Sequence, residues 1–108
     1  MSYENKKLAI IGRLFEADFG EKAFTLQYKD PNTLTLTAIK GPDVGRIQNL
    51  QVTIVELRPN LFMVNWQEAN KLTVTDIEDY ENGVVYANMT TPNDNFVTAK
   101  GTLKEIRA

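Results

Sequence analysis

Two side chains whose types suit chemistry, Trp66 and Glu68, stand close together near the end of the strand-like run Leu61–Glu68. Side chains alternate between the two faces of a strand, so both point to the same face. On a buried face, a carboxyl group is either paired with a cation or held neutral as an acid. If this face is the inner one, the chain has an acid inside a pocket.

The residue types in the chain narrow this chemistry. The sequence has no histidine and no cysteine. This composition excludes disulfides, thiolate metal sites, cysteine nucleophiles and serine–histidine arrangements. Acid–base chemistry would therefore use Asp, Glu, Tyr, Lys or Arg, and a carboxylate retuned by burial is the best candidate. We expect no cofactor and no metal site.

Length and charge restrict the partners. The chain has 108 residues, 12 of them basic and 14 acidic, for a net charge of −2. We expect one domain over residues 1–108 and, since the charges are interspersed, no nucleic-acid partner. Lys6 and Lys7 precede an apolar run, Leu8–Gly12, that is too short for a signal peptide or a membrane span. We therefore expect a soluble, cytoplasmic protein with no membrane partner.

The elements that must position Trp66 and Glu68 are predicted to be strands, because turn signals recur about every ten residues between β-rich runs. No convincing helix is found. The predicted strands are Ile10–Asp18, Lys22–Lys29, Thr33–Lys40, Arg46–Leu57, Leu61–Glu68, Leu72–Tyr80, Val84–Thr91 and Asn95–Ile106. The strongest turn signal is Asn82-Gly83, which predicts a type I′ turn with positive φ at both central residues.

Register is predicted by pairing strands so that apolar and polar residues separate, because a slip of one residue exchanges the faces. Each of four hairpins places even-numbered residues inside. The pairs that define them are Tyr28 with Leu34, Lys40 with Arg46, Leu57 with Leu61, and Glu68 with Leu72. About eight sequential strands with one apolar face predict an all-β, antiparallel up-and-down barrel of the lipocalin type, which encloses side chains or one small ligand. The alternative is a two-sheet sandwich without a cavity.

The same parity rule sends five charged residues inward: Arg46, Glu56, Glu68, Asp76 and Glu78. Glu56 and Glu78 flank Phe62 near one end and are interpreted as a solvated rim. Asp76 lies deeper and is expected either to pair with a Lys or Arg or to accept backbone hydrogen bonds at a bulge.

Glu68 and Arg46 are the candidate catalytic pair. The predicted register puts Glu68 opposite Leu50, with Arg46 about 13 Å further along the same face. Their side chains would either meet over a bound anion or form an internal ion pair. Candidate ligand-binding residues are Trp66, Tyr28, Asp76, Val64 and Phe24. Trp66 would stack on a ligand or simply fill the core, and the Tyr28 hydroxyl would reach a ligand or water at the mouth.

Three stretches, Val64–Glu68, Leu72–Tyr86 and Gly101–Leu103, resemble the MoaF-like domains. The resemblance extends from about Arg46 to Leu103 and implies a calycin-type barrel. The chain is more distantly similar to the phenolic acid decarboxylases, in which a Trp-x-Glu strand follows a Gly-Arg strand start. That similarity implies that Glu68 is a proton donor and Arg46 its charged partner. Leu14–Asp18 lacks the tyrosine pair that this family uses to hold the substrate carboxylate.

Three functions follow as hypotheses. The first is a barrel that binds a small, partly apolar, anionic or aromatic ligand. The second is a lyase or isomerase in which a buried glutamate donates a proton, so enzyme activity is left open. The third is a structural or interaction barrel with a filled core, whose outer face forms a homodimer.

Overall fold

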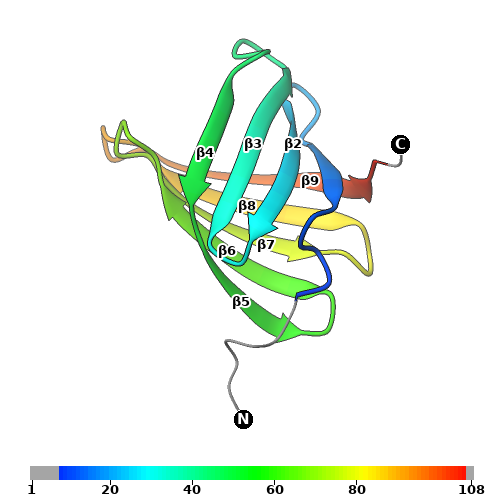
Figure 1. Ribbon diagram of the computed structural model, residues 1–108. Coiled ribbons are helices and arrows are strands. Elements are labelled where there is room, and N and C mark those ends of the chain that lie inside the picture. Colours follow the sequence, from blue (N-terminus) through cyan, green and yellow to red (C-terminus); the bar gives the residue numbers. More distant parts are fainter. Residues whose placement is uncertain (1–7, 107–108) are drawn as a thin grey trace.

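The computed structural model describes residues 8–106, which form one antiparallel sheet of nine strands (Figure 1). The strands are β1 (Leu14–Asp18), β2 (Ala23–Asp30), β3 (Thr33–Lys40), β4 (Ile47–Gln51), β5 (Thr53–Arg58), β6 (Leu61–Gln67), β7 (Thr73–Asp79), β8 (Val84–Thr90) and β9 (Phe96–Glu105). The predicted all-β, antiparallel class is confirmed. Lys6 and Lys7 lie outside the described residues. In the described part of the chain, no helix is long and apolar enough to cross a membrane.

The hydrogen-bonded order of the sheet is β4-β3-β2-β1-β9-β8-β7-β6-β5. Its two outermost strands, β4 and β5, are consecutive in the chain and meet at Val52, whose N–H donates to the Asn32 carbonyl at 2.8 Å. The predicted strand Arg46–Leu57 is therefore divided, which gives nine strands instead of about eight. The sheet ladder ends at β4 and β5, so the predicted closed barrel is not shown by the hydrogen bonds.

The predicted register is confirmed in two hairpins, where Tyr28 faces Leu34 and Trp66 faces Val74. Two of the four pairs that define the predicted hairpins are wrong. Arg46 pairs with Ala38 and not with Lys40, because the Gly45 N–H and the Arg46 carbonyl both bond to Ala38. The shift of two residues leaves the parity unchanged.

The second wrong pair is Leu57 with Leu61. A bulge between Glu56 and Arg58 places Arg58 opposite Leu61 instead. Beyond the bulge, Ile54 faces Val64 as the parity rule requires. A bulge adds one residue to one strand, so it moves the partner at the turn without changing the rest of the register.

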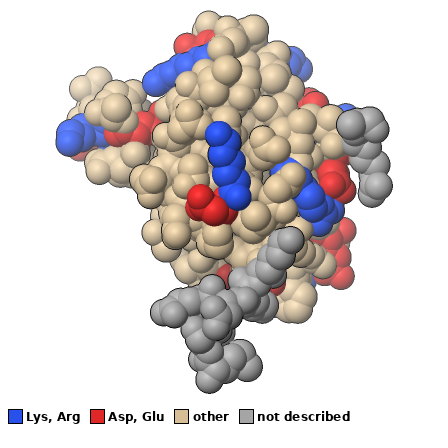
Figure 2. Space-filling view, in the orientation of Figure 1, with Lys and Arg blue, Asp and Glu red and all other residues tan. Residues whose placement is uncertain are grey.

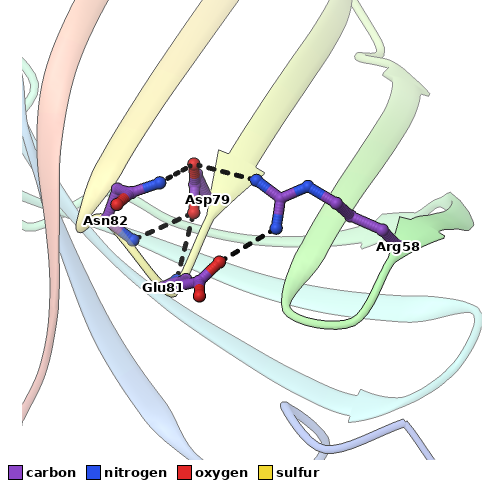
Figure 3. A network of polar contacts seen from close by, with 4 residues as sticks. All are labelled: Arg58, Asp79, Glu81 and Asn82. Carbon is purple, nitrogen blue, oxygen red and sulfur yellow. Dashed lines mark hydrogen bonds and ion pairs between the residues drawn. The ribbon is translucent and has the colours of Figure 1, made fainter.

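The Asn82-Gly83 turn is not of type I′, since only Gly83 has positive φ, at 67°. Asp79 instead organises the turn by accepting hydrogen bonds from the Asn82 side chain (2.8 Å), the Asn82 N–H (3.0 Å) and the Glu81 N–H (3.1 Å). These bonds, led by that of the Asn82 side chain, lower the pKa of Asp79. Arg58 at the end of β5 pairs with Glu81 at 2.9 Å and with Asp79 at 3.9 Å (Figure 3).

The two ends of the sheet differ. One, called here the open end, carries the loops 19–22, 41–46, 68–72 and 91–95. The opposite end, called the closed end, carries the loops 31–32, 59–60 and 80–83. Ile10 packs into the core at the closed end with 1% of its surface exposed, and the Gly12 N–H donates to the Tyr28 carbonyl at 2.8 Å. Tyr80 packs there against Phe15, with ring centroids 4.6 Å apart.

The outer surface carries few charges on the face shown in Figure 2, where acidic and basic side chains lie among a majority of uncharged ones. Polar, uncharged residues occupy most of the outward-facing positions of β2 and β3. One of them, Thr35, donates a hydrogen bond from its hydroxyl to the Asn49 side chain of β4 at 2.8 Å. The interspersed charges expected from the sequence are seen on this face.

We predict that Gly101→Ala destabilises the protein by about 2–3 kcal/mol, because extra volume at a close backbone contact strains the packing. A Cβ at Gly101 would stand 2.5 Å from the Asp18 carbonyl oxygen of β1. Urea denaturation measures the loss. The neighbouring exposed substitution Thr102→Ala is the control and should change the free energy of unfolding by less than about 0.5 kcal/mol. Equal losses in the two variants would contradict the prediction.

Candidate functional site

A cavity of about 540 Å³ occupies the inside of the sheet at its open end. Its apolar lining residues are Ala17, Phe19, Phe24, Leu26, Leu36, Trp66, Leu72, Val74, Ala87, Met89, Val97 and Ala99. Its polar lining residues are Glu21, Lys22, Asp43, Arg46, Gln48, Glu68, Asn70 and Asp76. The combination of apolar walls with a few polar groups is typical of small-molecule sites.

The cavity has space because the inward side chains of β1, β8 and β9 are small at this level. On β1, Phe15 lies toward the closed end and Ala17 toward the open end, and on β8 Val85 is followed in the same way by Ala87. Ala87 faces Ala99 of β9 in the sheet, so alanines line one continuous wall. Toward the closed end, Phe15 and Val85 have at most 2% of their surface exposed and fill the interior.

The structure brings five of the seven predicted site residues to this cavity. They are Arg46, Glu68, Trp66, Asp76 and Phe24. The other two, Tyr28 and Val64, are fully buried and are not among its lining residues. The Tyr28 hydroxyl therefore does not lie at the mouth, because Tyr28 packs toward the closed end.

Glu68 and Trp66 interact directly. The Trp66 indole Nε1–H donates to Glu68 Oε2 at 3.2 Å, and each residue has 8% of its surface exposed. Arg46 is exposed at the mouth, and within residues 8–106 no ion pair joins it to Glu68. The predicted facing of Glu68 and Leu50 is wrong as a sheet pair, because β4 is hydrogen-bonded to β3 and not to β6. The catalytic roles of Glu68 and Arg46 stay predictions.

A buried polar cluster lies beyond the cavity, centred on Glu78. The Tyr28 hydroxyl donates to both carboxylate oxygens of Glu78 at 2.8 and 2.9 Å, and the Tyr80 hydroxyl donates to Oε1 at 2.7 Å. Glu78 has no exposed surface, so its interpretation as a solvated rim residue is wrong. The physical reason is that Ile10 and the aromatic packing of Tyr80 seal this end.

Asp76 connects the cluster to the cavity. It lines the cavity and forms a side-chain hydrogen bond with Glu78, so the expected partners, a Lys, an Arg or a bulged backbone, are replaced by a second carboxyl group. A hydrogen bond between two carboxyl groups requires a proton on one of them.

The environments of the two groups place that proton on Asp76. Burial raises the pKa of Asp76 well above its usual range, and the charge of Glu78 raises it further. Burial also raises the pKa of Glu78, but the hydrogen bonds from Asp76, Tyr80 and Tyr28 oppose that rise. Because Glu78 already accepts hydrogen bonds from two tyrosine hydroxyls, which favour its charged form, we infer that Asp76 is the neutral member and donates its O–H to Glu78.

Sequence reasoning missed this cluster for an identifiable reason. The parity rule placed Tyr28, Asp76 and Glu78 on the inner face, and Tyr80 continues the same parity. Tyr28 and Glu78 are 50 residues apart, however, and belong to strands that are not neighbours in the sheet. Local register gives the face of each residue but not its partner across the interior.

In the part of the chain that the structure describes, no group of three or more Asp or Glu side chains is arranged to hold a metal ion.

Comparison with known proteins identifies the family, because the MoaF-like family matches residues 11–104. The chain belongs to the MoaF-like family. A crystal structure from Burkholderia vietnamiensis, provisionally described as a beta-lactamase, has a similar fold with a TM-score of 0.88. The two chains share 21% identity over 94% of this MoaF-like chain and 100% of the other, so the similarity shows the fold alone. No curated protein matches this MoaF-like chain.

We predict that Glu78→Gln destabilises this MoaF-like protein by about 3 kcal/mol, because the amide turns an acceptor of buried donors into a donor. Asp76→Asn is the matched variant: its amide can still donate to Glu78, so we expect a change of at most about 1 kcal/mol. Urea denaturation of both variants at neutral pH makes the comparison. Equal destabilisation would show that Asp76 does not hold the proton.

The raised pKa of Asp76 also predicts a pH dependence. Asp76 in the folded protein keeps a proton that it releases at about pH 4 in the unfolded chain. Its contribution to the free energy of unfolding is therefore complete below that pH and is lost as pH rises through the raised pKa. The pKa of Glu78 is also raised, so Glu78 contributes a pH dependence of stability in the same direction. Asp76→Asn removes the Asp76 contribution, so its stability should fall less than that of the wild type in denaturation curves between about pH 5 and 9. Parallel pH profiles would contradict the assignment.

Proposed function

We propose that this MoaF-like protein binds one small, partly apolar molecule inside its sheet. The observation that carries the proposal is the cavity of about 540 Å³ at the open end. Small-molecule sites usually measure about 300–1,000 Å³ and combine apolar walls with a few polar groups. A structural barrel with a filled core, the other non-enzymatic hypothesis, would need inward side chains larger than Ala17, Ala87 and Ala99 at this end.

Aromatic groups suit the walls of the cavity. Trp66 presents its ring to the cavity while its N–H is bound by Glu68, so the ring position is fixed by a hydrogen bond. Phe19 and Phe24 line another part of the cavity, with ring centroids 6.3 Å apart. A fixed aromatic surface favours stacking with a planar ligand, since little side-chain freedom is lost on binding.

We also propose that the sheet works as a closed, lipocalin-like barrel around the ligand. Two observations support this: β4 and β5 are joined directly at Val52, and β4 lies in contact with β6. Side-chain contacts between β4 and β6 would then complete the wall where the ladder of hydrogen bonds ends.

We do not infer a beta-lactamase reaction for this protein. The similarity to the Burkholderia vietnamiensis protein shows the fold alone. The sequence offers no histidine or cysteine, and Ser2 is its one serine.

The test is a thermal-shift screen with a small-molecule library balanced between amines, acids and neutral compounds. A ligand that binds the folded state raises the melting temperature. Trp66, the one tryptophan in the sequence, lines the cavity, so its fluorescence should also change on binding of a non-fluorescent ligand.

We predict that Ala87→Phe blocks the cavity and reduces binding by at least about tenfold. The control is Tyr86→Phe on the outward-facing neighbour, which should bind as the wild type does. Absence of any ligand in all three library classes, or equal binding by Ala87→Phe, would overturn the proposed function.

A further inference from the structure

The charges of the cavity lining change with depth. At the mouth, both signs occur together on exposed residues: Glu21 and Asp43 are acidic, and Lys22 and Arg46 are basic. Further in, the ionisable lining residues are Glu68 and Asp76, with 8% and 6% of their surface exposed. Among the described lining residues, the two cations stay at the mouth, and the buried ionisable groups are acids.

The two buried acids lie on one face of the β6–β7 hairpin with an aromatic ring between them. Glu68 bonds through its N–H to the Leu72 carbonyl, Trp66 faces Val74, and Val64 faces Asp76. Four residues along β7 therefore separate the level of Glu68 from that of Asp76, a distance of about 13 Å. A ligand with its charged end at Asp76 would place an adjoining apolar body along Trp66, which lies between the two levels.

Both acids offer hydrogen-bond acceptors to the cavity. A carboxylate has about four lone-pair sites, of which the Trp66 N–H uses one at Glu68. Asp76 uses its one proton in the hydrogen bond that it donates to Glu78, so its remaining lone pairs can only accept hydrogen bonds. A ligand carboxylate at this depth would meet hydrogen-bond acceptors and the negative charge of Glu78, which is unfavourable.

The other groups around Asp76 add no positive charge. Its strand neighbours, Val64 of β6 and Ala87 of β8, are uncharged, and the ionisable groups close enough to act on it are Glu78, Tyr28 and Tyr80. Burial raises the pKa of both tyrosines, which keeps them neutral. The net charge behind the cavity floor is therefore the negative charge of Glu78.

We propose that the cavity selects a cationic ligand, an aromatic or apolar amine whose ammonium group is received by Asp76 while its body packs on Trp66. The inference rests on the proposed function, that the cavity binds a small molecule. On binding, Asp76 gives up its proton to the solvent and the ammonium group takes its place beside Asp76 and Glu78. One proton is thus released for each amine bound, and no covalent bond is made in the ligand.

The test compares compounds that differ only in the charged group: phenethylamine, 2-phenylethanol and 3-phenylpropionate, with tryptamine, tryptophol and indole-3-propionate as a second series. Isothermal titration in two buffers of different ionisation enthalpy gives the affinity and the number of protons released. We expect each amine to bind at least about tenfold more tightly than the matching acid and to release up to one proton.

Two variants, in each of which a carboxyl group is replaced by the matching amide, locate the effect. Asp76→Asn should abolish the proton release and weaken amine binding by about tenfold. Glu16→Gln is the control, because Glu16 points outward from β1 and lies 4.0 Å from Lys104. It should bind and release protons as the wild type does. Folding of each variant is checked by its melting temperature.

The inference and the proposed function fail in different ways. If library acids bind as tightly as amines or more tightly, or if amine binding releases no proton and is unchanged in Asp76→Asn, the selection for amines is wrong while the cavity remains a binding site. If no amine, acid or neutral compound binds, the proposed function fails, and the inference fails with it.

Discussion

The buried carboxylate of Glu78 is the constraint on which the interior depends. Without exposed surface, it must receive its hydrogen bonds from the protein, and it receives them from Tyr28 of β2, Tyr80 after β7 and Asp76 of β7. Leaving such a charge without donors costs several kcal/mol, on the order of 3–5. The cluster therefore fixes how β2 and β7 stand across the interior, and it closes the floor of the cavity.

Packing then divides the molecule into a filled half and a hollow half. Phe15, Phe62 and Val85 fill the interior around the Glu78 cluster, while Ala17 and Ala87 leave space on the other side of it. The cavity costs packing contacts, and these contacts are lost where the side chains are smallest.

Hairpin register was predictable because it follows from alternation along neighbouring strands, as the pairs of Tyr28 with Leu34 and Trp66 with Val74 show. The predicted register is wrong at Arg46, where backbone hydrogen bonds of a glycine-rich loop determine the strand partner, and at Leu57, where a bulge interrupts the pairing. The depth of Glu78 was not predictable, since parity assigns a face but does not say which end is sealed. Trp66, Glu68 and Asp76 could be assigned to the interior, but the proton shared by Asp76 and Glu78 depends on contacts across it.

The junction at Val52 gives the wall a mechanical asymmetry. Every other neighbouring pair of strands in the described sheet is held by ladder hydrogen bonds, whereas β4 and β6 lie close together without such a ladder. Separating them would expose some apolar surface but break no ladder bond, so widening the mouth costs least on this side. In the described sheet, the seam between β4 and β6 is thus the place where two strands can separate without breaking a ladder hydrogen bond.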